Sequence, residues 1–250
     1  MKILINRSDA IGDTLLTLPI VKALKASDPE AQIAFLTSAR SQEIFEMVEG
    51  VDHYWTLPSG KWAQMRTACR AIRQWRPDVY VYLGGSHVPS FCAWPLRVSQ
   101  RPGLRSRLPS FLFLNAGVRQ KRALAESHES GYNLELLAPL FFFFFTEQIK
   151  ARARRDWAPT LEWAPRKQEQ VREKLRDALV AQKGDEGPLE REWILVHPGM
   201  TGHTLNWPVS TYVEWVRQME KTFPERFLFI LSYTPSDQDY VDSFHREMAS

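Results

Sequence analysis

The chain has 250 residues, which is enough for one large domain or two domains of ordinary size. Its content of 44% hydrophobic and 24% charged residues is that of a globular protein and excludes a mainly disordered chain. The 32 basic and 29 acidic residues leave a net charge of +3, too small to indicate nucleic acid as a partner. No secretion signal precedes the first strand pattern, and the longest apolar run is too short to cross a bilayer. We therefore expect a soluble or peripheral protein of the cytoplasm.

The first half of the chain alternates between strand and helix patterns. Strands are predicted at 2–6, 32–37, 53–57 and 78–83, and helices at 13–24, 42–48 and 62–75. Such alternation predicts βαβ units, a parallel sheet and right-handed crossovers. Because ligands of open α/β sheets bind beyond the carboxyl ends of the strands, the residues that follow each strand are the first candidates for a site.

A basic segment and an apolar segment follow the fourth strand pattern. Positions 97–122 carry seven basic residues and no acidic one. They form either a solvated basic surface or a surface for an anionic partner, such as a phosphorylated sugar or an acidic membrane face. The apolar segment at 133–145 includes five phenylalanines in a row, starting at Phe141. We predict a buried helix wedged between domains there, with a membrane-contacting edge as the alternative.

Residues 151–165 contain two Ala-Pro pairs and a charge cluster and form the predicted linker. The alternation then restarts, with helices predicted at 166–182, 209–222 and 236–248 and strands at 193–197 and 227–232. We therefore predict an N-terminal domain at 1–150 and a C-terminal domain at 166–250. Because a doubly wound sheet normally has about five or six strands, we expect the second domain to be truncated.

The motif RSDAIGDT at 7–14 joins the first strand to the first helix, where a ligand is expected. It has neither G-x-G-x-x-G nor G-K-[ST], which disfavours a dinucleotide oxidoreductase and a P-loop protein. Asp13 has two interpretations. Either it caps the helix by accepting backbone N–H bonds, or it is a carboxylate in a cleft that takes a proton from an attacking hydroxyl.

A second motif, HPGMTGHTLNWP at 197–208, also follows a strand and precedes a helix. Its glycines and the N–H groups of the following helix can hold a diphosphate, and Thr201 and Thr204 add hydroxyl donors. His197 is either a structural residue or a ligand contact. The six histidines of the chain lack cysteine or carboxylate partners at ligand spacing, so no metal site is predicted.

Together the two motifs resemble glycosyltransferase family 9, the heptosyltransferases of the lipopolysaccharide inner core. The resemblance is carried by positions 3–24 and 197–208, by an H-E-x-x-x-N-L match from His128, and by an R-x-G match from Arg101. It implies an α/β, GT-B-like fold of two Rossmann-like parallel-sheet domains. The acceptor sugar would bind the N-terminal domain and ADP-heptose the C-terminal one. The implied reaction is an inverting, metal-independent transfer without a cofactor.

The resemblance also implies roles for individual residues. Asp13 corresponds to the general base, and Lys61 and Arg101 lie in regions that meet acidic acceptor sugars. The donor-binding residues implied are His197, Gly199, Thr201, Asn206, Trp207 and Asp237. The implied partners are a nucleotide sugar, a lipid-linked sugar acceptor, and the inner membrane as a peripheral contact at its cytoplasmic face.

Two departures from the family pattern keep alternatives open. Leu205 stands where the family often has Lys or Arg, so one cation that would stabilise the leaving diphosphate is missing. The family's later G-P-x-H-x-A-A segment has no counterpart in the chain. The alternatives are a related transferase that uses another nucleotide sugar or acceptor, and a transferase-like domain without catalysis.

Overall fold

The computed structural model describes residues 1–105, 110–140, 161, 165–183, 190–198 and 206–249. The chain divides into two compact units, Met1–Ala164 and Pro165–Ser250, and each is described by itself. The predicted linker falls at this division. Most of it lies outside the described residues, so the domain boundaries drawn from the sequence stay a prediction.

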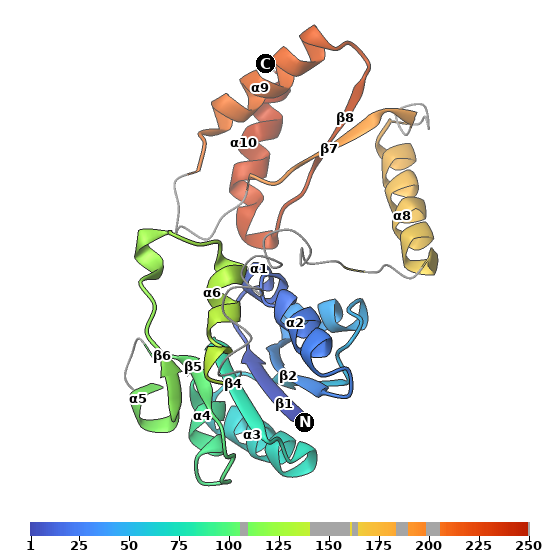
Figure 1. Ribbon diagram of the computed structural model, residues 1–250. Helices are drawn as coiled ribbons and strands as arrows, with labels where there is room; N and C mark the ends of the chain where they lie inside the picture. Colours follow the sequence, from blue (N-terminus) through green and yellow to red (C-terminus); the bar gives the residue numbers. More distant parts are fainter. Residues whose placement is uncertain (106–109, 141–160, 162–164, 184–189, 199–205, 250) are drawn as a thin grey trace. The chain divides into compact units, whose positions relative to one another are not determined.

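The first unit is built on a six-stranded sheet in which all neighbouring strands run parallel. Its strands are β1 (Lys2–Arg7), β2 (Gln32–Ser38), β3 (His53–Leu57), β4 (Val79–Gly84), β5 (Pro102–Leu104) and β6 (Ala116–Val118). Their order across the sheet is β3-β2-β1-β4-β5-β6 (Figure 1). This order runs outward in both directions from β1 and β4, so the switch point lies between them. The predicted parallel α/β sheet is confirmed.

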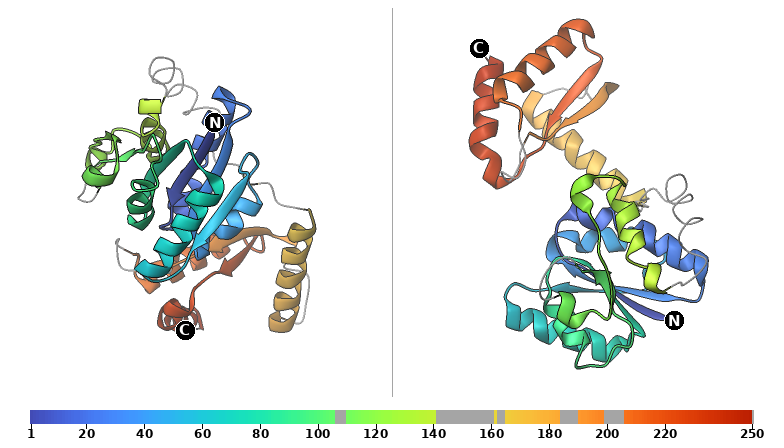
Figure 2. Two further views of the ribbon diagram at one scale, coloured as in Figure 1. Left: turned by 90° about the horizontal axis from the view of Figure 1, so that it is seen from below. Right: turned by 60° about the vertical axis from the view of Figure 1, so that its left-hand side comes forward.

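Helices cover both faces of this sheet (Figures 1 and 2). They are α1 (Ile11–Leu15), α2 (Pro19–Ser27), η1 (Ala39–Glu46), α3 (Lys61–Trp75), α4 (Val88–Ala93), α5 (Ser110–Phe113), η2 (Arg122–Leu124), α6 (Glu129–Glu135) and η3 (Ala138–Leu140). In β1, Ile3 and Ile5 join a core with α2 and α6, whereas Leu4 joins a second core with α3 and α4. This alternation is typical of a strand buried on both faces.

The helix predicted at 13–24 is two helices in the structure. Pro19 lacks an N–H group and its ring would clash with the carbonyl of Leu15, so one continuous helix cannot pass through this point. Helix α1 therefore ends at Leu15, and α2 begins with Pro19 at its first position. As a result, Asp13 lies on a short helix of its own directly after β1.

The single apolar helix predicted from position 133 is wrong in the described residues, because α6 ends at Glu135 and the separate 3-10 helix η3 follows at Ala138–Leu140. The apolar side chains between them are buried as predicted. Leu136 and Leu137 are fully buried in the first core. Asn133 is buried too, and its side-chain Nδ2 donates to the carbonyl of Leu16 at 3.1 Å, which ties α6 to the start of the chain. Residues 141–145 lie outside the described residues, so the membrane-contacting alternative for the phenylalanines stays a prediction.

The second unit contains a parallel pair of strands, β7 (Glu192–Val196) and β8 (Phe227–Leu231). Its other elements are α8 (Pro165–Lys183), α9 (Val209–Thr222), η5 (Pro235–Asp237) and α10 (Gln238–Ala249). Residues of α9 and α10 form a small core centred on Val213, Val216 and Phe244. Among the described residues of the whole chain, no helix combines the length and the apolarity that a membrane span requires.

Candidate active site

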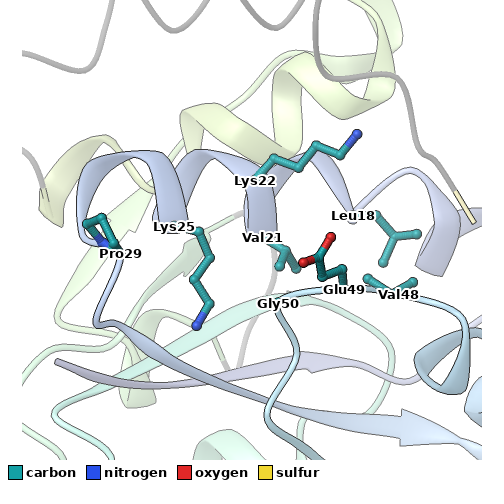
Figure 3. Close-up of a pocket in the computed structure, with 8 residues that line it drawn as sticks. All are labelled: Leu18, Val21, Lys22, Lys25, Pro29, Val48, Glu49 and Gly50. Atoms are coloured by element: carbon teal, nitrogen blue, oxygen red, sulfur yellow. The ribbon is translucent and has the colours of Figure 1, made fainter. Parts of the chain in front are cut away.

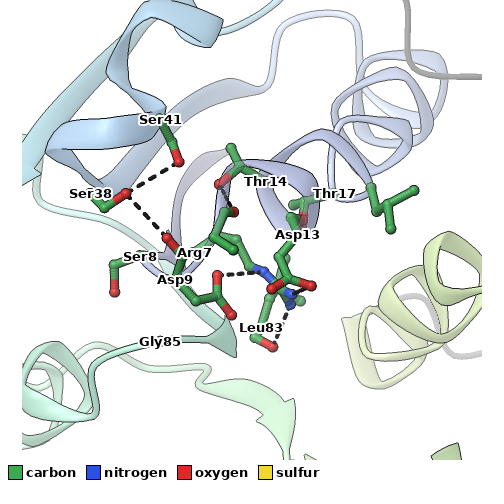
Figure 4. A network of polar contacts seen from close by, with 12 residues as sticks. Arg7, Ser8, Asp9, Asp13, Thr14, Thr17, Ser38, Ser41, Leu83 and Gly85 are labelled. Atoms are coloured by element: carbon green, nitrogen blue, oxygen red, sulfur yellow. Dashed lines mark hydrogen bonds and ion pairs between the residues drawn. The ribbon is translucent and has the colours of Figure 1, made fainter. Parts of the chain in front are cut away.

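The side chain of Arg7 organises the switch point of the first sheet. It ends β1, and only 4% of it is exposed. Its Nε lies 2.9 Å from Oδ1 of Asp9, and its Nη2 lies 2.8 Å from Oδ1 of Asp13 (Figure 4). Its Nη1 donates to the carbonyl of Leu83 in β4 at 2.9 Å. One buried guanidinium thus holds two carboxylates and joins the ends of the two central strands.

Asp13 is not a helix cap. The N-cap residue of α1 is Ala10, which has no side chain able to accept a hydrogen bond, and Asp13 is the third residue of the helix. The carboxylate of Asp13 instead pairs with Arg7 and is 40% exposed. The capping interpretation is therefore wrong, and Asp13 combines a fixed position with contact to solvent.

Both carboxylates open into a cavity of about 360 Å³. Its lining comes from the carboxyl ends of β1 and β4 and from residues later in the first unit: Arg7, Asp9, Asp13, Tyr82, Leu83, Gly84, Gly85, His87, Leu104, Arg122 and Glu129. A cavity beside the switch point of an open parallel sheet is the expected place for a ligand.

Asp9, Arg122 and Glu129 belong to this cavity but were not identified from the sequence. Burial raises the pKa of the Asp9 carboxyl, the negative charge of Asp13 raises it further, and the charge of Arg7 opposes both. Arg122 forms an ion pair with Glu129. The site therefore contains two groups of ion-paired side chains. One is Arg7 with Asp9 and Asp13, and the other is Arg122 with Glu129. Asp9 had a signal in the sequence, because it follows β1 within the same motif as Asp13.

The loop after β4 is fixed against the loop after β1. The backbone N–H of Ser86 donates to Oγ of Ser8 at 3.0 Å, and Nδ2 of Asn6 donates to the carbonyl of Ser86 at 2.8 Å. The hydroxyl of Tyr82 donates to the carbonyl of Gly85 at 3.1 Å. These contacts bring the residues after both strands together to form one wall of the cavity.

Gly85 is required where these two loops meet. Its φ is +80°, and a Cβ added there would lie 2.4 Å from Oγ of Ser8 and 2.8 Å from its carbonyl carbon. Gly85→Ala is therefore expected to lower the free energy of unfolding by about 2 kcal/mol or more, measured by urea denaturation. Gly12→Ala is the matched control, because an added Cβ at Gly12 meets nothing within 4 Å. An equal loss of stability in both variants would contradict this account.

The two predicted acceptor residues lie in different surroundings. Lys61 is exposed and begins α3 after Gly60, whose φ is +89°. Arg101 donates from Nε to the carbonyl of Phe113 at 2.7 Å and from Nη1 to the carbonyl of Val98, and burial lowers the pKa of its guanidinium. Arg101 thus connects the segment that follows α4 with the last residue of α5. An additional contact with an acceptor stays a prediction for both residues.

Several of the predicted donor-binding residues meet at the carboxyl end of the strand pair in the second unit. Nδ1 of His197 lies 2.9 Å from the carbonyl oxygen of Ser232, which can only accept, so this nitrogen carries the ring proton. The side chain of Asn206 donates to the carbonyl of Pro198 and accepts from the hydroxyl of Tyr212 at 3.2 Å. Trp207 is exposed, and its ring centre lies 5.3 Å from that of Tyr212.

The remaining predicted donor residues are placed as follows. Asp237 lies in the turn after β8, where its carboxylate accepts from Oγ1 of Thr234 at 2.5 Å and from the Thr234 N–H at 2.9 Å. These bonds from Thr234 hold the pKa of the Asp237 carboxyl below its usual value. This is a capping box, a structural role that does not depend on a nucleoside. Gly199 and Thr201 lie outside the described residues.

A second cavity, of about 440 Å³, lies between α2 and the segment before β3 (Figure 3). It is lined by Leu18, Val21, Lys22, Lys25, Pro29, Val48, Glu49 and Gly50. Nζ of Lys25 already donates to the carbonyl of Ala31 at 2.7 Å and lies 3.6 Å from Asp52. None of the residues at the switch point lines this cavity, so it does not belong to the candidate site.

Known proteins that are similar to this chain match it over both units. No family model matches the chain. A putative glycosyltransferase of Haemophilus influenzae is 22% identical over 224 residues, which is 89% of this chain and 61% of that protein. The structure of a family 9 glycosyl transferase from Veillonella parvula matches with a TM-score of 0.77 at 15% identity. The match includes 99% of this chain and 66% of the V. parvula chain.

Two E. coli structures agree with these relatives. ADP-heptose lipopolysaccharide heptosyltransferase II has a TM-score of 0.73 at 18% identity, with 99% of this chain and 69% of that chain covered. A heptosyltransferase with ADP has a TM-score of 0.64 at 16% identity, with 100% and 72% covered. This chain spans less than two thirds of the H. influenzae protein. The predicted α/β, GT-B-like fold is confirmed, because this chain shares the fold of these glycosyltransferase family 9 structures.

Proposed function

We propose that the protein is an inverting, metal-independent glycosyltransferase that moves a heptose from ADP-heptose to a lipopolysaccharide core acceptor. The observation that carries this proposal is the carboxylate of Asp13, which Arg7 holds at the switch point and which opens into a cavity of about 360 Å³. A general base needs such a combination of fixed geometry and access to the substrate.

In the proposed reaction, Asp13 takes the proton of an acceptor hydroxyl while that oxygen forms a bond to the anomeric carbon of the donor. The bond between the anomeric carbon and the donor phosphate oxygen breaks, and ADP leaves with the bonding electron pair. Because Oδ1 of Asp13 is held by Arg7, we assign the proton to the other carboxylate oxygen. Attack from the face opposite the leaving group inverts the anomeric centre.

The donor diphosphate is proposed to bind the segment at 197–208. The pairing of Asn206 with Pro198 joins the two ends of this segment at the end of β7, next to the first turn of α9. The N-terminus of that helix favours a negative charge. His197, Gly199, Thr201 and Trp207 are proposed as further donor contacts and Asp237 as a nucleoside contact, while Lys61 and Arg101 are proposed for the acceptor.

Donor and acceptor identity are tested together in a transfer assay. The protein is incubated with ADP-heptose, ADP-glucose or UDP-N-acetylglucosamine, with and without a heptose-free lipopolysaccharide core. Of the three donors, we expect only ADP-heptose to be used. With it, ADP should be released only when the acceptor is present, and the mass of the core should increase by one heptose. Turnover with another donor would support the alternative of a related transferase. No turnover with any donor, despite binding of ADP in calorimetry, would support a transferase-like domain without catalysis.

Because the proposed acceptor is lipid-linked, we propose that the transfer takes place at the cytoplasmic face of the inner membrane.

A further inference from the structure

Helices α3, α4 and α5 form a surface without negative charge. Positions 61–77 and 79–125 contain no acidic residue, although the chain as a whole has 29 acidic residues against 32 basic ones. In α3 the exposed positions follow the spacing of one helix face, with Trp62, Arg66, Arg70 and Arg73 at i, i+4, i+8 and i+11. Lys61 is exposed at the start of the same helix.

Large apolar side chains project from the same three helices. The exposed fractions are 77% for Trp62, 45% for Phe91, 54% for Trp94 and 66% for Leu112. The ring of Phe113 in α5 lies 5.4 Å from that of Phe91 and 6.0 Å from that of Trp94, both in α4. Phe91, Trp94 and Phe113 therefore form one aromatic ridge. Arg101 holds α5 beside the segment that follows α4, because it donates to the carbonyls of Phe113 and Val98.

The exposed cations of α3, which are Lys61, Arg66, Arg70 and Arg73, lie on the same face of the first unit as the aromatic ridge. Helices α3 and α4 pack on the same core, and Figure 1 shows α4 between α3 and α5. The hydroxyl of Ser86, just before α4, donates to Oε1 of Gln64 at 2.6 Å, and the thiol of Cys92 lies 3.6 Å from the carbonyl of Met65. These contacts place the N-terminal half of α3, with Trp62, beside α4.

We infer that the outer surface of α3, α4 and α5 docks on a bilayer that contains anionic lipids. Trp and Phe side chains favour the boundary between headgroups and acyl chains, and Arg and Lys favour anionic headgroups beside them. A nucleic acid would use the cations but leave the side chain of Leu112 without a partner, because an aliphatic chain offers no stacking surface. This inference names a membrane partner for the proposed transferase. It is argued only from the exposed residues of α3, α4 and α5, and it does not require that the protein transfers a sugar.

Vesicle co-sedimentation tests this surface. We expect the protein to bind vesicles of phosphatidylcholine mixed with phosphatidylglycerol at least about tenfold more tightly than vesicles of phosphatidylcholine alone, and to lose this preference in high salt. Leu112→Ser and Arg66→Glu are each expected to weaken binding several-fold. Leu124→Ser and Arg40→Glu, which change an exposed leucine and an exposed arginine elsewhere, are matched controls expected to bind normally.

The outcomes separate this inference from the transfer reaction. Asp13→Asn is expected to bind vesicles as the unaltered protein does, whether or not it transfers sugar. Circular dichroism and urea unfolding of each variant establish that it is folded. Equal binding to both kinds of vesicle, equal effects of test and control variants, or binding to DNA or RNA in preference to vesicles would each overturn the inference.

Discussion

Asp13→Asn is expected to lower kcat for sugar transfer by about 10²–10⁴-fold, the range typical of a lost general base. The amide has the size of the carboxylate, and its oxygen can still accept the hydrogen bond from Nη2 of Arg7 at the position Oδ1 occupies now. The contacts of the switch point should therefore persist, and the KM for the donor should change little. The measurement is steady-state release of ADP, with unfolding followed by circular dichroism.

Two comparisons make this result specific. Glu30→Gln removes one exposed negative charge from the same unit, outside the residues that line the cavity, and is expected to leave kcat unchanged. Asp9→Asn removes the other carboxylate that Arg7 holds. If Asp9→Asn abolishes transfer while Asp13→Asn retains nearly normal turnover, the base is Asp9 and the proposed mechanism is wrong.

The central part of the fold could be predicted because its strands are long and apolar. β1 to β4 each have five to seven residues, and each is bounded by a change of pattern that the sequence makes visible. β5 and β6 have three residues each and were missed. Three residues carry no measurable period. These strands form through pairing with β4 and with each other, which is a property of the assembled sheet and not of the segment.

The sequence predicted only those site residues that directly follow a strand, because their place at the edge of the sheet is determined by their order in the chain. Asp13 was identified because it follows a strand within a recognisable motif. The pairing of Arg122 with Glu129 was not, because it depends on how η2 and α6 are placed beside the sheet. Arg101 shows the opposite case. The family resemblance implied that it meets an acidic acceptor sugar, yet its guanidinium bonds the carbonyls of Val98 and Phe113, contacts that no spacing in the sequence indicates.

Arg7→Met is expected to destabilise the protein by about 3 kcal/mol at neutral pH. Removing one partner of a buried ion pair costs about 3–5 kcal/mol, and the lower end applies because Asp9 and Asp13 keep some contact with solvent. Transfer should fall as well, since Asp13 loses the group that holds it. Arg7→Lys is the informative companion, because it keeps the charge but cannot bond Asp9, Asp13 and Leu83 at once. It should recover part of the stability and less of the activity.

The pH dependence of this loss follows from the burial of Asp9. The folded-state pKa of Asp9 lies above its ordinary value of 3.8, and Arg7 is the group that opposes the rise, so Arg7→Met should raise this pKa further. A carboxyl that has taken up its proton no longer needs a cation beside it. The difference in unfolding free energy between the unaltered protein and Arg7→Met should therefore shrink as the pH falls from neutral toward the raised pKa of Asp9. Urea unfolding of both proteins across this range measures it. A difference that stays constant would mean that the side chain of Arg7 stabilises the switch point by packing and by its bond to Leu83, and not through the charges of the two carboxylates.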